Sequence, residues 1–166
     1  AYIAFGGESA LDRLDDHENL VILRTFSKWA GMAGLRLGYA ALAPHLARDL
    51  ERIRPPYNVN AAAMVAALAT FADVETVEEN VARVVEERER LRERLSGIPW
   101  LEPLPSQTNF LLCRVLDRDA RRVAERLLDE GILILGYSDP VMADYVRISV
   151  GTPEQNDALL NALLRS

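Results

Sequence analysis

The stretch "RTFSKWAGMAGLRLGYA", residues 24–40, contains Lys28, the only lysine of a chain that also has eighteen arginines. Thr25 and Ser27 come just before this lysine, and Arg36 follows it after a glycine-rich run. A primary amine that loses its proton can form a Schiff base with an aldehyde, which a guanidinium does not do. Hydroxyl groups and a guanidinium can bind phosphate oxygens. The stretch therefore predicts a lysine that binds a phosphate-bearing aldehyde, which is the chemistry of pyridoxal 5'-phosphate (PLP).

The composition limits the class of protein. With 166 residues, the chain suffices for one domain or for parts of two. Its net charge of -6 disfavours a nucleic-acid or membrane partner, because both reward a basic surface. The single Cys113 cannot form an internal disulfide, which predicts a reducing, cytoplasmic compartment. We expect His17 and His45 at the surface, and no metal site.

Strand and helix patterns alternate in the first part of the chain. Apolar runs at 1–6, 19–25 and 37–43 are typical of strands that are buried on both faces. Residues 8–18 have helical spacing, and a second helix is predicted at 44–53, where a proline occupies its first turn. This alternation predicts an α/β fold with a mostly parallel sheet.

The next segments predict a helical connection. Two prolines make residues 54–60 an extended connector, because each disfavours helix in the residue before it. An apolar helix at 61–72 is expected to be buried. The helix at 74–95 has an apolar stripe with charged residues elsewhere, which indicates an amphipathic helix.

From about residue 100 the pattern predicts a small α+β layer. Strands are expected at 108–115, 132–135 and 145–151. The helix at 118–130 would have Asp117 as its N-cap and Gly131 as its stop. A final helix begins at a capping box that Thr152 opens.

Six segments follow one another along the chain: "AYIAF", "RTFSK", "AGLRLGY", "PPYNVN", "PSQTNFLLCRV" and "YVRISVGTPEQND". Together they resemble the histidinol-phosphate aminotransferase family, within the class I/II aminotransferases of PLP fold-type I. The resemblance implies the C-terminal portion of the PLP-dependent transferase fold. It would comprise part of the large, mostly parallel sheet domain (1–60), connecting helices (61–99) and a small α+β domain (100–166). Since the chain begins at Ala1, without the family's preceding Asp, we expect a partial chain that binds PLP weakly or not at all alone.

The resemblance also implies an activity and a role for each matching residue. The family exchanges an amino group between a primary amine and 2-oxoglutarate or glutamate, in a homodimer. Lys28 would hold the cofactor as a Schiff base and then shuttle a proton. Tyr2 would bind the phenolic oxygen of the cofactor, whose phosphate would be bound by Thr25, Ser27 and Arg36. Arg147 would bind the anionic group of the substrate, with Asn109 nearby.

One position departs from the family pattern. The family usually has a second arginine where this chain has Leu135 or Gly136. One charged hydrogen bond fewer weakens phosphate binding by about 1.5–3 kcal/mol, so a singly charged aromatic amino acid is an alternative substrate. Two further alternatives are a PLP lyase such as threonine-phosphate decarboxylase and the aminotransferase-like sensor domain of a transcription regulator.

Overall fold

The computed structural model describes residues 1–165. Contacts divide the chain into two compact units, Ala1–Val81 and a second unit that begins at Ala82. Among the described residues, no helix is both long and apolar enough to cross a membrane. The same residues hold no group of three or more potential metal ligands of the His, Cys, Asp or Glu type.

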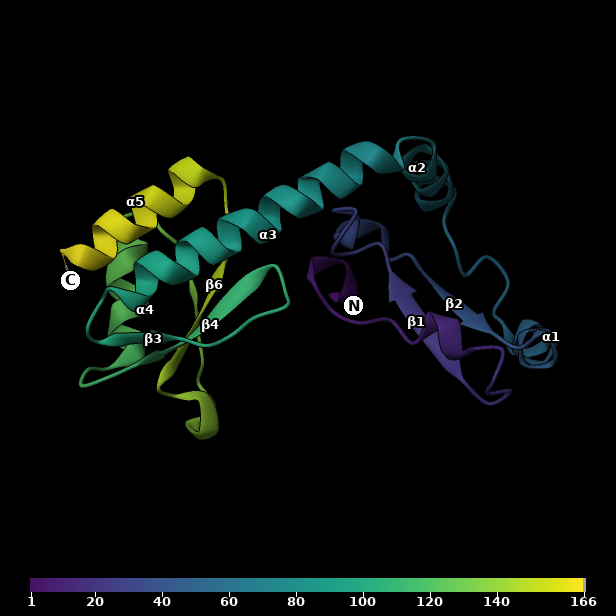
Figure 1. Cartoon of the computed structure of the whole chain (residues 1–166), viewed down its shortest axis with the longest axis horizontal. Helices are drawn as coiled ribbons and strands as arrows, with labels where there is room; N and C mark the ends of the chain where they lie inside the picture. Colours follow the sequence, from purple (N-terminus) through teal and green to yellow (C-terminus); the bar gives the residue numbers. More distant parts are fainter. Residues whose placement is uncertain (166) are drawn as a thin grey trace. The chain divides into compact units, whose positions relative to one another are not determined.

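The first unit is built around an antiparallel pair of strands, β1 (Val21–Thr25) and β2 (Gly38–Leu42). Three short 3-10 helices, η1 to η3, occupy Ile3–Phe5, Leu11–Arg13 and Ala33–Leu35. Helices α1 (Pro44–Ile53) and α2 (Ala61–Ala72) follow, as Figure 1 shows. The positions of these two strands, of α1, of α2 and of the irregular connector between the helices confirm the sequence prediction. The predicted burial of the strands on both faces is wrong, because neither strand has a buried residue and Leu23 is 73% exposed.

Two predicted elements of this unit are wrong. Where a strand was predicted at 1–6, Ile3–Phe5 form η1, because the backbone groups bond within the segment, with Phe5 N–H donating to Tyr2 O at 2.9 Å. In an apolar run this short, the spacing of apolar residues does not distinguish a strand from a helix. Of residues 8–18, only η2 is helical. Here the hydroxyl of Ser9 accepts the N–H of Leu11 at 3.1 Å, a local bond that competes with helix formation.

The prediction that α2 is buried is also wrong. Only Ala63 is buried, while four large side chains are more than half exposed: Met64, Val65, Leu68 and Phe71. An apolar composition favours burial, but a helix is buried only where another surface of the protein covers it. Both sheets of the described chain are antiparallel, so the mostly parallel large-domain sheet stays a prediction.

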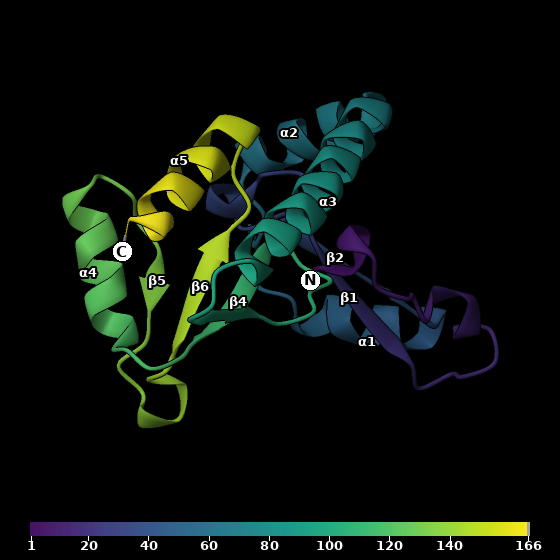
Figure 2. The same cartoon turned by 60° about the vertical axis from the view of Figure 1, so that its left-hand side comes forward.

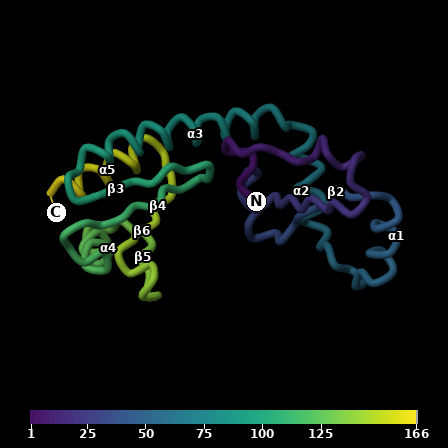
Figure 3. Tube along the Cα trace, turned by 60° about the horizontal axis from the view of Figure 1, so that its bottom comes forward, coloured from purple at the N-terminus to yellow at the C-terminus, as the bar shows by residue number. Residues whose placement is uncertain are grey.

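The second unit is a four-stranded antiparallel sheet covered by helices on one face. The strand order is β3 (Leu101–Pro103), β4 (Phe110–Val115), β6 (Tyr145–Ser149) and β5 (Leu135–Gly136). The helices are α3 (Val74–Ser96), which begins in the first unit, α4 (Ala120–Asp129) and α5 (Pro153–Leu164), and a short η4 occupies Pro140–Met142. Figures 2 and 3 show α5 beside the C-terminal half of α3.

The core of this unit lies between the helices and one face of the sheet. The register places Leu111 opposite Ile148 and Cys113 opposite Val146, and all four are buried. They join buried leucines of the three helices: Leu91, Leu95, Leu127, Leu159, Leu160 and Leu163. Because side chains alternate along a strand, the residues between these positions lie on the opposite, uncovered face. That face carries Arg147.

Three details of the second unit differ from the prediction. The N-cap of α4 is Asp119 rather than Asp117, because its carboxylate accepts two backbone N–H groups of the first turn. Only the end of the predicted strand 132–135 pairs with β6, as the two-residue β5. Residues 131–134 leave the sheet, and together with the end of β6 and the first half of α5 they line a hollow of about 510 Å³. The short β3 was not predicted. Gly131, at φ 78°, and the capping box at Thr152 are confirmed.

Cys113 is expected to be inert in the folded protein. Its side chain is fully buried, and burial raises the pKa of the thiol to about 12. Since the thiolate is the reactive form, iodoacetamide at about pH 8 should not modify Cys113 within an hour but should modify it in guanidinium. Mass spectrometry measures both, and full alkylation without denaturant would contradict this placement.

Candidate functional site

Lys28 lies in the connection between β1 and β2. Two backbone bonds close this connection: Phe26 N–H donates to Leu37 O, and Met32 N–H donates to Phe26 O, both at 3.1 Å. The Phe26 ring is 3% exposed and packs against the rings of Trp29, Tyr39 and Phe71, with centroids 5.5–5.7 Å away. The loop that carries Lys28 is therefore fastened at its base by an aromatic cluster.

The structure brings Tyr2 and Lys28 together, although they are far apart in the sequence. The Nζ of Lys28 lies 5.6 Å from the centroid of the Tyr2 ring, within the range of a cation–π contact. Within residues 1–165, Lys28 forms no ion pair with a carboxylate. Its amine thus faces an aromatic ring instead of an acidic partner.

The hydroxyls and the guanidinium predicted to bind phosphate occupy the same loop. Thr25 Oγ1 accepts the N–H of Ser27 at 3.1 Å and donates to Leu37 O at 3.3 Å. Arg36 has a left-handed backbone (φ 56°), and its Nη1 donates to Ala33 O at 2.9 Å. Among the described residues, no hydrogen bond joins Arg36 to either hydroxyl.

Sequence reasoning missed the part that Asn60 plays in this loop. Its Nδ2 donates to the carbonyl of Leu35 at 3.2 Å, next to Arg36, and its Oδ1 accepts the N–H of Ala63 at 2.8 Å. Asn60 is therefore the N-cap of α2 and also fixes the turn that carries Arg36. An asparagine directly before a helical run is a recognisable capping signal.

The side chains of this loop fit PLP. The amine of Lys28 is the nucleophile that an aldehyde requires, and its contact with the Tyr2 ring places a phenol beside it. The Ser27 hydroxyl and the Arg36 guanidinium are donors of the kinds that bind a phosphate, whereas the Thr25 hydroxyl donates to Leu37 O in this structure.

The second group of predicted residues surrounds Arg147 on the uncovered face of the small sheet. In the register, Leu112 lies opposite Arg147 on one side and Leu135 on the other. The guanidinium carbon lies 5.1 Å from the centroid of the Phe110 ring. Its Nε is buried without a hydrogen-bond partner. A buried donor without a partner is costly, and an anionic ligand would satisfy it.

Asn109 is held close to the strand of Arg147. Its carbonyl accepts the N–H of Val150 at 3.0 Å, just beyond the end of β6. Asn109 and Arg147 therefore lie in the same unit, and their common substrate site stays a prediction. Phe110 was missed as a neighbour of Arg147, although strand alternation from Leu112 puts it on the same face.

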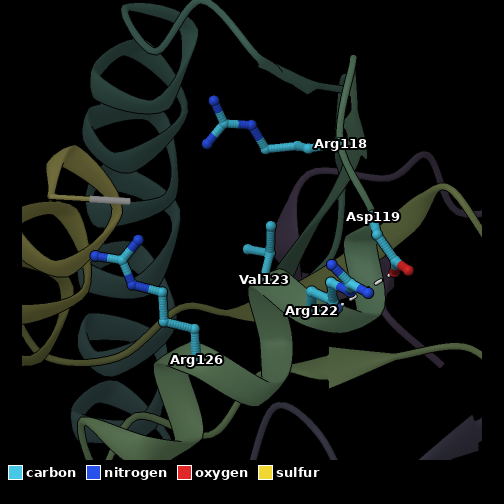
Figure 4. Close-up of a pocket in the computed structure, with 5 residues that line it drawn as sticks. All are labelled: Arg118, Asp119, Arg122, Val123 and Arg126. Atoms are coloured by element: carbon cyan, nitrogen blue, oxygen red, sulfur yellow. Dashed lines mark hydrogen bonds between the residues drawn. The ribbon is translucent and has the colours of Figure 1, made fainter.

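A separate hollow of about 340 Å³ lies at the start of α4 and contains none of the predicted site residues. Figure 4 shows Val123 between the side chains of Arg118 and Arg126. Arg118 stacks over the Trp100 ring at 4.2 Å, and Arg126 donates to the carbonyl of Arg165. These arginines are used in packing, so the hollow is not a candidate for the substrate site.

The chain is similar to known proteins over nearly its whole length. The family model described as "Aminotransferase class I and II" matches residues 1–163. The histidinol-phosphate aminotransferase of Roseiflexus castenholzii is 49% identical over 98% of this chain, which covers 45% of that protein. The chain thus spans about half the length of the curated relatives it matches.

Two solved structures resemble the fold. One is the histidinol-phosphate aminotransferase of Sinorhizobium meliloti in complex with pyridoxal-5'-phosphate, at 30% identity and a TM-score of 0.85, covering 99% of this chain and 46% of that one. The other is the L-threonine-O-3-phosphate decarboxylase of Porphyromonas gingivalis, at 26% identity and a TM-score of 0.86, covering 99% of this chain and 52% of that one.

Proposed function

Because the chain belongs to the class I and II aminotransferase family, we propose that its protein is a PLP-dependent histidinol-phosphate aminotransferase. The observation that carries this proposal is the position of Lys28. Its amine lies in a closed loop, over the Tyr2 ring, without a carboxylate partner among residues 1–165. The 49% identity to a histidinol-phosphate aminotransferase supports the choice of substrate.

Each residue of the two groups has a definite part in this proposal. When bound, PLP supplies the electron sink for the reaction. The amine of Lys28 holds the cofactor covalently and moves the proton at the substrate α-carbon. Tyr2 donates to the phenolic oxygen, while the phosphate is bound by Thr25, Ser27 and Arg36. Arg147 binds the anionic group of the amine substrate beside Asn109.

The surroundings of Arg147 favour a second candidate substrate. Leu112, Leu135 and the Phe110 ring make this part of the sheet face apolar, with one guanidinium. A phosphate is better bound by two guanidinium groups, whereas a carboxylate on an apolar body matches one. An aromatic amino acid is therefore the alternative amino donor.

The test uses the protein expressed from the full reading frame that contains this chain, called the complete protein below. Purified with PLP, it is given 2-oxoglutarate and each of three donors: histidinol phosphate, phenylalanine and threonine phosphate. Glutamate formation from histidinol phosphate, with the highest kcat/KM of the three, is the expected result. Release of CO₂ from threonine phosphate without glutamate would identify a lyase and refute the proposal, and no activity at all would favour a sensor domain.

Replacing Leu135 by arginine is expected to strengthen binding of a phosphate-bearing donor. The new guanidinium would lie directly opposite Arg147 in the sheet register. One added charged hydrogen bond, about 1.5–3 kcal/mol, should lower KM for histidinol phosphate by about tenfold or more. Steady-state kinetics with phenylalanine, measured in parallel, should show a smaller decrease in KM.

Leu133→Arg is the matched control. Leu133 is 81% exposed and lies in the segment that leaves the sheet. Its replacement should therefore change neither the KM for histidinol phosphate nor the KM for phenylalanine. Equal effects of the two variants would contradict the placement of the substrate anion at Arg147.

The wider organisation is proposed on the same basis. We infer that β1 and β2 belong to a large, mostly parallel sheet domain of the complete protein. Residues 1–60, 61–99 and 100–166 would then be the end of that domain, the connecting helices and the small domain. A cytoplasmic homodimer that uses 2-oxoglutarate as amino acceptor completes the proposal.

A further inference from the structure

Helix α3 carries two charged side chains that are buried inside the second unit. Glu87 is 8% exposed and Arg88 is 5% exposed, and with Asn156 they are the buried polar or charged side chains of residues 1–165. Burying a charge is costly unless it is paired and hydrogen-bonded. The partners of these two neighbours therefore indicate what they stabilise.

Glu87 acts on the chain that follows β6. Its Oε1 accepts a hydrogen bond from Asn156 Nδ2 at 2.8 Å. The same Nδ2 donates to Gly151 O at 3.2 Å, and Asn156 Oδ1 accepts the N–H of Gly151 at 3.1 Å. Both backbone groups of Gly151, four residues after Arg147, are thus fixed by a side chain that α3 orients.

Arg90 keeps the Glu87 carboxylate in place. It donates to both carboxylate oxygens, from Nε at 2.8 Å and from Nη2 at 2.6 Å, and its Nη1 donates to Asp157 at 2.9 Å. The bonds from Arg90 to Glu87, with the one from Asn156, lower the pKa of Glu87 although burial opposes this. The carboxylate is therefore ionised at neutral pH and is a strong acceptor for Asn156.

Arg88 acts on the other segment of the proposed substrate site. Its Nη1 donates to the carbonyl of Thr108 at 2.9 Å. Thr108 directly precedes Asn109, and its Oγ1 accepts the N–H of Phe110 at 3.2 Å. The segment that carries Asn109 and Phe110 is thereby tied to the same turn of α3 that carries Glu87.

We propose that Glu87 and Arg88, with Asn156, are positioning residues for the substrate-binding face of the small sheet. One turn of α3 fixes the end of the strand that carries Arg147 and the start of the strand that carries Phe110. The backbone bond between Asn109 O and Val150 N then joins the two fixed ends directly. This sets the guanidinium of Arg147 over the Phe110 ring, where it meets the substrate anion. The inference rests on the proposed function for its kinetic consequence only.

The kinetic test replaces Arg88 by lysine and Asn156 by aspartate in the complete protein. Lysine keeps the charge but loses the planar fork, and aspartate keeps the acceptor for Gly151 N–H but cannot donate to Gly151 O or to Glu87. Each variant is expected to raise KM for the amino donor about tenfold, the effect of one lost charged hydrogen bond. kcat, normalised to the folded and cofactor-loaded fraction, should change less than about twofold.

Two matched controls separate positioning from stability. Arg121 on α4 is exposed and pairs with Glu125, away from the partners of Arg88, and Asn161 on α5 is exposed. Arg121→Lys and Asn161→Asp should leave KM unchanged. If Arg88→Lys and Asn156→Asp lower Tm but leave KM at the parent value, the role is structural only and the proposal is overturned.

Amide hydrogen exchange tests the positioning without any activity. In Arg88→Lys, exchange should increase at the amides of Asn109 and Phe110, and in Asn156→Asp at Val150 and Gly151, while the core strand amide of Cys113 stays protected. Unchanged exchange at these amides would refute the proposal. If both variants show the expected increase in exchange but the unmutated complete protein transaminates no donor, the proposed function is refuted. The positioning inference then still stands.

Discussion

Replacement of Lys28 by alanine in the complete protein is expected to abolish transamination. Alanine removes both the covalent link to the cofactor and the group that moves the proton at the substrate α-carbon. Loss of a positioned acid–base alone lowers kcat by about 10²–10⁴-fold, and loss of the covalent link adds to it. Steady-state kcat measures the loss of the acid–base group. The loss of the covalent link is measured by the visible band that borohydride removes and by the near-ultraviolet absorbance that then stays with the protein on dialysis.

Two variants show whether the amine or only the charge matters. Lys28→Arg retains a cation over the Tyr2 ring but no nucleophile, so it should be as inactive as Lys28→Ala. Arg24→Lys is the matched control in the same segment, because the Arg24 guanidinium donates to Ser9 Oγ, outside the proposed site. A Lys28→Ala protein with the parent's kcat and visible absorbance would refute the proposed function.

Replacement of Arg147 by alanine is expected to have the second largest effect, on KM rather than on folding. The Nε of Arg147 is buried without a partner, so the folded chain loses no hydrogen bond of that atom. An anionic donor would lose one or two charged hydrogen bonds of about 1.5–3 kcal/mol each, which raises KM by about 10- to 100-fold or more. Kinetics with histidinol phosphate and with phenylalanine measure the loss for each anion.

Arg114→Ala is the control for a change of net charge. Arg114 lies two residues from Leu112 in β4 and therefore on the same sheet face as Arg147, but it is exposed to solvent. Its removal should alter KM less than about twofold at physiological ionic strength, because screening weakens the field of exposed charges. An equal effect of both variants would mean that the sheet face acts through its general charge, not through a specific contact of Arg147.

Signals that are local in sequence predicted most of the helices and strands. The proline at the start of α1, the stripe of α3 and the capping box of α5 each act within a few residues, and each is present in the structure. The error about the burial of α2 concerns a partner surface, whereas those at residues 1–6 and 8–18 concern local bonds that composition does not reveal. Residues 1–6 have the composition of a strand, but their backbone bonds locally as η1.

The candidate site divides in the same way. Thr25, Ser27 and Lys28 could be recognised from one short stretch, because the spacing of chemical groups along a loop is a property of the sequence. The cation–π contact of Lys28 with Tyr2 and the bond of Asn60 to Leu35 join segments far apart in the chain. Their contact depends on how the loop closes, which no single segment specifies.

By itself, the sequence determined which chemical groups are present and predicted their roles: one lysine amine as nucleophile, nearby hydroxyls and a guanidinium as phosphate donors, and an arginine on a strand. The tertiary structure alone decided the surroundings of that arginine, with Phe110, Leu112 and Leu135 beside it and the buried pair Glu87 and Arg88 behind the two segments that hold it. The reason is that the type of each side chain and the spacing of neighbouring side chains are properties of the sequence. Strand register and the burial of a charged side chain depend instead on contacts between segments that are far apart in the chain. These contacts form together, so no single segment determines them.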